Sequence, residues 1–264
     1  MRHSARMSGV VSCLVLITVS IVLAQDDPTA AEVAKAWQAR RLAEFEAYEV
    51  VLASPQGDVP VKFERASVLS WSNPIRKTAA GAVFLWTIDG RPQLIASTYP
   101  YENGIEQELT SMSESPLVLR GDKVFTHRFT PGIEWKEISG AEPPHKQRAL
   151  RLTQMRRIAE RFHVQGGNQR KFDARLLPQP IFRSSSESKI DTAVFAFVQG
   201  TDPEAVLMIE PTDKPGWRYA LARMTTVPIA ADLDDERVWD LPACWNTRLA
   251  DEMPFHTIQL PGAK

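Results

Sequence analysis

The sequence predicts an α+β fold built from two similar modules, each a helix packed on a curved antiparallel meander. Three observations predict it. A stripe of apolar residues at helical spacing occurs twice, apolar runs separated by turn residues follow each stripe, and the order of these features repeats. With 264 residues, of which 44% are apolar, the chain is long enough to bury a sizeable core.

Residues 1–24 are predicted to be a secretory signal peptide. Arg2 and Arg6 give a basic start, residues 10–23 form an uncharged and largely apolar run, and Ala24 ends a small-residue cleavage site. The run is shorter than the roughly 20 residues that span a bilayer, so we expect cleavage, the alternative being an uncleaved anchor. The mature protein is then expected in the periplasm, cell envelope or extracellular medium, without a membrane span.

The first module is predicted over residues 25–142. Val33, Trp37 and Phe45 belong to one apolar stripe, which predicts a helix over residues 30–50 with Thr29 as its N-cap. Four strands are predicted to follow it, over residues 61–71, 82–88, 93–99 and 106–113.

The second module is predicted over residues 143–264, after a connection at residues 140–144. Its helix is expected over residues 150–164, because Met155, Ile158 and Phe162 share a stripe that Gly166 and Gly167 end. Its strands are expected over residues 171–183, 192–199, 205–210 and 217–225.

The modules are predicted to be copies, because short matches recur in the same order. Ala-Val-Phe occurs at residues 82–84 and again at 193–195, and Pro92 and Pro203 are likewise 111 positions apart. The alternative is that ordinary strands match by chance. Since residues 82–88 and 194–198 are apolar on both faces, we expect these strands to be central or to lie where the copies meet.

One helix on a curved meander resembles the cystatin-like and NTF2-like architectures, a resemblance of architecture that carries over no functional residue. The stretches Trp-Ser-Asn-Pro-Ile-Arg at residues 71–76 and Val-Phe-Leu-Trp-Thr-Ile-Asp-Gly-Arg-Pro at residues 83–92 also resemble a family of uncharacterised exported bacterial proteins. That resemblance implies export and no particular activity.

Composition excludes several classes of function. The mature chain has 29 basic and 32 acidic residues, which gives no support for nucleic-acid binding. After signal cleavage Cys244 is alone, so no internal disulfide forms, and its role stays open between a buried apolar side chain, an intermolecular bridge and a nucleophile. The four mature histidines lack the spacing of a zinc site, and we expect neither a metal nor a cofactor.

Two polar segments have plain structural interpretations. The acidic residues from Asp232 to Glu236 lack the spacing and glycine of a calcium-binding loop, so a solvated loop or a helix start is expected. The serine-rich residues 184–188 are expected to be a loop tip, which is a poor frame for a catalytic serine.

Aromatic and arginine residues are the candidates for ligand binding. Trp217 and Tyr219 alternate with Arg218 on one predicted strand, so the two rings share a face. The hypothesis is an aromatic-lined pocket for a sugar or peptide, in which arginines orient an anionic group; the alternative is that the rings are core. The candidate residues are Trp217, Tyr219, Arg218, Arg223, Trp86 and Arg91, with Arg76 as a further arginine.

The function favoured by the sequence is a non-catalytic binding or structural module of the periplasm or cell envelope, with a small ligand or an envelope protein as partner. Whether it is an enzyme is left open. The alternative is a metal-free hydrolase or isomerase that uses an acid/base pair in an open cone, and a homo-oligomer is a third hypothesis.

Overall fold

The computed structural model describes residues 29–73, 78–121, 126–245 and 252–261. The predicted signal peptide and Arg76 lie outside the described residues. The predicted α+β fold, with a helix packed on a meander in each module, is wrong: the structure is mostly antiparallel β, with 50% strand, 12% helix and only two helices in the described residues. The prediction lacked the strands that come before and after each meander. These strands extend the sheets, and the resulting sheet is curled into a half-barrel.

The N-terminal half, residues 29–129, begins with a helix and continues with nine strands. They are α1 (Ala30–Glu46), β1 (Glu49–Leu52), β2 (Val59–Pro60), β3 (Lys62–Phe63), β4 (Leu69–Asn73), β5 (Thr78–Ile88), β6 (Arg91–Tyr101), β7 (Gly104–Ser111), β8 (Leu117–Arg120) and β9 (Thr126–Phe129).

The C-terminal half, residues 148–241, also begins with a helix and continues with eight strands; one strand precedes this half and one follows it. They are β10 (Lys136–Glu137), α2 (Arg148–Ala159), β11 (Phe162–Gly166), β12 (Phe172–Leu176), β13 (Phe182–Arg183), β14 (Ala193–Gln199), β15 (Asp202–Pro211), β16 (Trp217–Arg223), β17 (Ile229–Leu233), β18 (Glu236–Leu241) and β19 (Phe255–Pro261).

Strand pairing in the N-terminal half recurs in the C-terminal half. The C-terminal sheet has the order β16-β15-β14-β12-β11-β17-β18, with β13 on β14. The N-terminal strands have the orders β7-β6-β5-β3 and β2-β1-β8-β9, with β4 on β5 and only Val61 between β2 and β3. Even an irregularity recurs, because the register shifts between Trp86 and Thr87 and again between Phe197 and Val198, 111 positions later.

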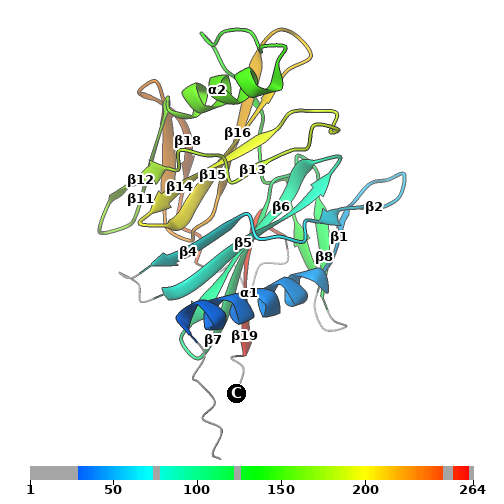
Figure 1. Ribbon diagram of the computed structural model, residues 1–264, viewed down its shortest axis with the longest axis vertical. Helices are drawn as coiled ribbons and strands as arrows, with labels where there is room; N and C mark the ends of the chain where they lie inside the picture. Colours follow the sequence, from blue (N-terminus) through cyan, green and yellow to red (C-terminus); the bar gives the residue numbers. More distant parts are fainter. Residues whose placement is uncertain (1–28, 74–77, 122–125, 246–251, 262–264) are drawn as a thin grey trace, which may run out of the picture.

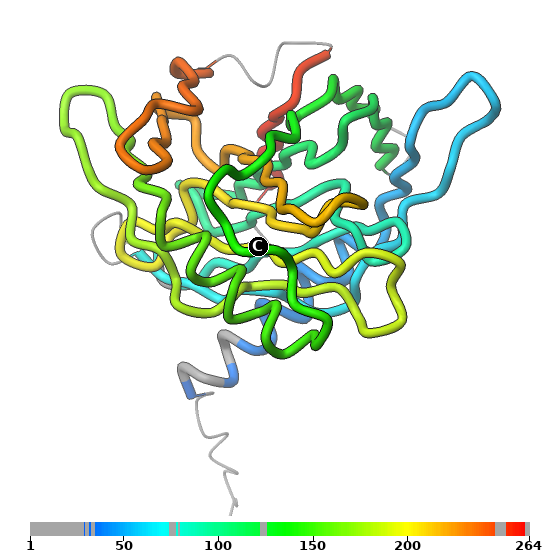
Figure 2. Tube along the Cα trace, turned by 90° about the horizontal axis from the view of Figure 1, so that it is seen from above, coloured from blue at the N-terminus to red at the C-terminus, as the bar shows by residue number. Residues whose placement is uncertain are grey.

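Each half also receives an edge strand from the segment that follows the other half. β10 comes after β9 in the chain and pairs with β16 of the C-terminal half. β19 comes after β18 and pairs with β7 of the N-terminal half, from Gly104 to Thr110. Viewed from above, the β1–β2 hairpin (light blue) and the β11–β12 hairpin (lime) project on opposite sides of the molecule (Figure 2).

The sheets that contain β5 and β14 pack against each other, and the helices lie on the outer faces (Figure 1). Successive residues of β5 point to opposite sides: Phe84 and Trp86 join the core beneath α1, whereas Val83 and Leu85 join a central core shared with the C-terminal half. β14 divides in the same way between the α2 core and the central core. The prediction that these two strands are covered on both faces is confirmed.

Both helices end earlier than predicted. Thr29 caps α1 through reciprocal hydrogen bonds with Glu32, as expected, but the helix stops at Glu46 because residues 49–52 pair with β8. Likewise α2 stops at Ala159, since residues 162–166 form β11, in which buried and exposed residues alternate.

The acidic segment near residue 234 is a hairpin turn. Asp234 and Asp235 both have positive φ, at 50° and 68°, and connect β17 to β18, which is the conformation of the tight turns preferred in hairpins. Arg161 and Arg237 pair with carboxylates of this hairpin. Among the described residues, no group of three or more His, Cys, Asp or Glu side chains is placed to hold a metal ion.

Truncation of Leu85 to alanine tests the shared central core. Leu85 has no exposed surface, and such truncations cost about 2–5 kcal/mol. Because the central core belongs to both halves, we expect Leu85→Ala to shift a single urea transition to lower concentration. Val59→Ala is the control, since Val59 is 41% exposed, and it should change stability by no more than about 0.5 kcal/mol. Two separate transitions in the native protein would contradict a shared core.

Candidate functional site

A buried carboxylate joins arginines from the two halves. Glu210 of β15 has no exposed side-chain surface, and it accepts hydrogen bonds from Arg91 of β6 and Arg218 of β16. Thr192 donates a further hydrogen bond to it over 2.8 Å. A buried carboxylate requires such compensation, because removing it from water is costly.

Glu210 binds the same edge of both guanidinium groups, the edge formed by Nε and Nη2. Arg91 donates from Nε (3.2 Å) and Nη2 (2.6 Å), and Arg218 donates from the same two positions, its Nε at 2.7 Å. The Nη1 group of each arginine has no partner within the described part of the chain. Two fixed positive charges thus share one negative charge and keep hydrogen-bonding capacity.

Trp135 packs against this pair. The Cζ atoms of Arg218 and Arg91 lie 4.6 and 5.6 Å from the centre of its ring, within the range of a cation–π contact. The ring is half-buried and also contacts the central core. It therefore limits the movement of both guanidinium groups.

A second carboxylate, Asp191, forms ion pairs with three arginines. Arg183 donates to both of its oxygens, at 2.8 and 2.7 Å, Arg151 donates from Nε at 2.8 Å, and Arg148 lies 3.1 Å away. Burial alone would raise the pKa of Asp191, but the hydrogen bonds from Arg183 and Arg151 outweigh it and lower the pKa. Asp191 is therefore ionised at neutral pH, and its cluster keeps an excess of positive charge.

Both clusters open on one hollow of about 630 Å³. A volume of this size lies within the range of ligand pockets. Five basic and three acidic side chains line the hollow, together with four neutral ones. The basic residues are Lys136, Arg151, Lys189, Lys214 and Arg218, the acidic residues are Glu137, Asp191 and Asp213, and the neutral residues are Trp135, Ile190, Pro211 and Thr212. We call it the basic cleft.

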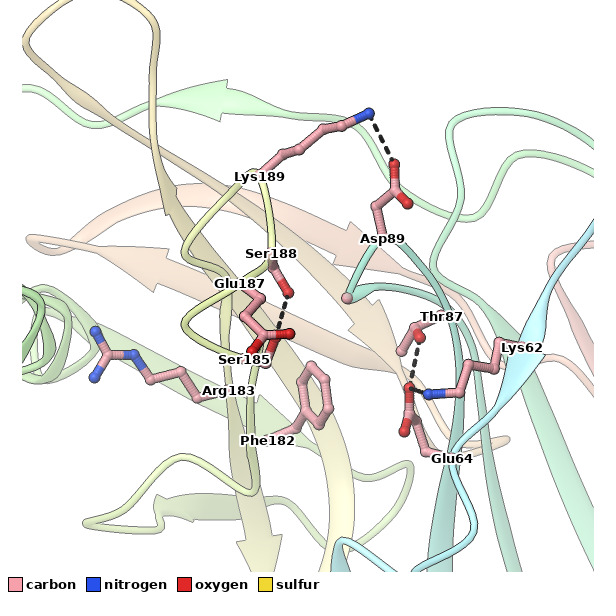
Figure 3. Close-up of a pocket in the computed structure, with 11 residues that line it drawn as sticks. Lys62, Glu64, Thr87, Asp89, Phe182, Arg183, Ser185, Glu187, Ser188 and Lys189 are labelled. Atoms are coloured by element: carbon pink, nitrogen blue, oxygen red, sulfur yellow. Dashed lines mark hydrogen bonds and ion pairs between the residues drawn. The ribbon is translucent and has the colours of Figure 1, made fainter.

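A neighbouring hollow of about 550 Å³ lies beside the loop of residues 184–191 (Figure 3). Lys189 lines both hollows and pairs with Asp89 across from the loop, at 3.2 Å. Gly90 suits this position, because its φ is +80° and a Cβ atom on it would lie 2.2 Å from the Ser188 hydroxyl. Basic and acidic residues balance in this lining, so it lacks the excess positive charge of the basic cleft.

Of the candidate residues from the sequence, the structure brings Arg91 and Arg218 together at Glu210. Arg223 lies elsewhere, is 7% exposed, and donates to the carbonyl groups of Thr225, Val227 and Pro242. Burial lowers its pKa.

The three candidate aromatic residues are buried. Trp86 lies in the core beneath α1, and Trp217 lies in the core beneath α2, where its Nε1 donates to the carbonyl of Glu142. Tyr219 is 3% exposed, but it contributes to the wall of a separate hollow of about 310 Å³ beside Trp239. None of the three lines the basic cleft.

The recurring strand pattern relates the basic cleft to a second position at the interface of the two halves, and this position is acidic. Arg91, Glu210 and Arg218 match Asp202, Tyr99 and Glu106 at offsets of 111 or 112. Nearby, the Tyr99 hydroxyl donates to Glu108 over 3.1 Å. Burial and the charge of Asp202 raise the pKa of Glu108 well above its ordinary value.

Cys244 is half-buried and is the free cysteine of the described residues. Burial raises the pKa of its thiol, which disfavours the reactive thiolate.

Comparisons with family models, curated proteins and solved structures find no match. Within the described residues, no helix is long and apolar enough to cross a membrane.

Sequence reasoning missed Glu210, Asp191, Arg151 and Trp135. A signal for Glu210 existed: the predicted strands 205–210 and 217–225 form a hairpin whose register places Glu210 opposite Arg218. Nothing in the sequence pattern places Trp135 or Arg151 beside that pair, because they come from a short edge segment and from α2.

The acidic end makes a pH-dependent contribution to stability. A carboxyl group with a raised folded-state pKa favours folding fully below its unfolded pKa, and this contribution is lost as the pH rises towards the folded-state value. We therefore expect Glu108→Gln, which mimics the protonated acid, to raise the melting temperature relative to the native chain, and more at pH 7 than at pH 4. Glu114→Gln, at an exposed position, should show no such trend. A Glu108→Gln effect that is the same at both pH values would contradict the raised pKa.

Proposed function

We propose that this protein is an exported, non-catalytic binding protein that holds an anionic ligand in the basic cleft. The observation that carries the proposal is that two buried carboxylates fix Arg218 and Arg151 at a hollow of ligand size, whose lining has five basic and three acidic side chains. Guanidinium groups held in place suit carboxylate and phosphate oxygens, because they donate in a fixed planar geometry.

Several features favour binding over catalysis. Arginine stays protonated at physiological pH and exchanges no proton in ordinary acid–base chemistry. The space between α2 and its sheet is packed with side chains such as Met155, Phe195 and Leu207, and Phe45 and Trp86 pack beneath α1. The alternative of a hydrolase or isomerase required an open cone at these positions.

A melting-temperature panel at constant ionic strength tests the proposal. We expect citrate or sulfate to stabilise the protein relative to chloride. An anion at about 100 times its Kd contributes about 2.7 kcal/mol, or roughly 5–10 °C for a chain of this size. Lys214→Ala and Arg218→Gln should each reduce this shift, because both side chains line the cleft.

Arg237→Gln is the matched control, since Arg237 is a half-exposed arginine paired with Asp232 and Asp240 on β18, outside the cleft. It should keep the full anion-dependent shift. Lys214 has no contact with Glu210 among its described interactions, so that variant separates ligand binding from loss of the buried cluster. Stabilisation that is absent, or equally reduced in Arg237→Gln, would contradict the proposal.

A further inference from the structure

The basic cleft presents two fixed donors on different elements. This inference rests on the proposed function and specifies its ligand. We infer that the ligand is an organic dianion, with one anionic group at Arg218 and the other at Arg151, joined by an uncharged middle.

Arg218 cannot turn freely within the cleft. Its Nε and Nη2 are both committed to Glu210, and its guanidinium lies against Trp135. Only Nη1 remains for a ligand. Turning the side chain away would leave the fully buried Glu210 short of a partner, which is strongly unfavourable for a buried charge.

Arg151 is fixed in the same manner by other partners. Its Nε donates to Asp191, and its Nη1 donates to the carbonyl groups of His145 (3.0 Å) and Lys146 (2.8 Å). Only Nη2 remains without a partner among the described residues. Arg151 is on α2 and Arg218 on β16, and each is tied to its own carboxylate, so the cleft offers two donors that are held independently.

The size and lining of the cleft favour an organic ligand over a simple ion. A volume of about 630 Å³ equals that of about twenty water molecules in the liquid, so a single inorganic oxyanion would fill a small part of it. Ile190, Pro211 and the ring of Trp135 supply apolar wall, which suits an uncharged middle. Glu137 and Asp213 also line the cleft and disfavour further anionic groups.

Calorimetric titration of the native chain with linear dicarboxylates of increasing length tests this inference. Monocarboxylates of the same length are the matched ligands. If each end of the ligand meets its own arginine, one dicarboxylate length should bind at least about tenfold more tightly than its monocarboxylate, because the second contact is then intramolecular. Shorter dicarboxylates should lose this advantage.

Variants of the two arginines test whether each of them binds one end of the ligand. Arg218→Gln and Arg151→Gln should each reduce the affinity of the best dicarboxylate to about that of the monocarboxylate, whereas Arg237→Gln should leave it unchanged. The native titrations decide the matter even if an arginine variant fails to fold. Equal affinities for dicarboxylates and monocarboxylates would overturn the inference and leave the proposed function standing. No binding of citrate, sulfate or any carboxylate would overturn both.

Discussion

A carboxylate with no exposed surface requires opposite charge beside it, and this requirement at Glu210 organises the interface of the two halves. Glu210 belongs to the C-terminal half, and it accepts from Arg218 of its own hairpin and from Arg91 of the N-terminal half. Coulombic attraction is stronger in a poorly solvated place than at the surface. The pairing therefore joins the halves and at the same time fixes the Arg218 guanidinium group in the basic cleft.

The packing of the halves explains why the cleft lies where it does. β5 and β14 alternate between a helix-covered core and the central core, so both faces of each sheet are occupied. Side chains consequently fill the layers, and the basic cleft lies at one end of the interface, where residues 189–191 meet Trp135 and the turn between β15 and β16. The two related ends of the interface differ in charge because Arg91 and Arg218 correspond to Asp202 and Glu106.

The central strands could be predicted from the sequence, and the curled sheet could not. Residues 82–88 and 194–198 are apolar on both faces, a strong signal for strands that are covered twice. The predicted helices include residues 49–50 of β1 and residues 162–164 of β11, because short alternating segments beside a helical stripe give a weak signal. Their pairing with β8 and β17 depends on distant residues, and it turned an expected four-strand meander into a larger sheet.

The site could be predicted only where alternation along a strand determines the face to which a side chain points. Alternation placed Arg218 on the opposite face from Trp217 and Tyr219, and the structure shows both rings buried while Arg218 reaches the cleft. The rings were hypothesised to line a pocket, but they lie in the core beneath α2, where their large apolar area is buried. Trp135 and Arg151 are brought in by tertiary packing alone.

A double-mutant cycle on Arg91 and Glu210 tests the central claim most directly. The free energy of unfolding is measured for the native chain, Arg91→Gln, Glu210→Gln and the double variant. If the buried carboxylate couples the two halves, the single effects will not add, and the coupling energy will be about 1–3 kcal/mol. Effects that add to within about 0.5 kcal/mol would show that the two residues act independently and would contradict the account.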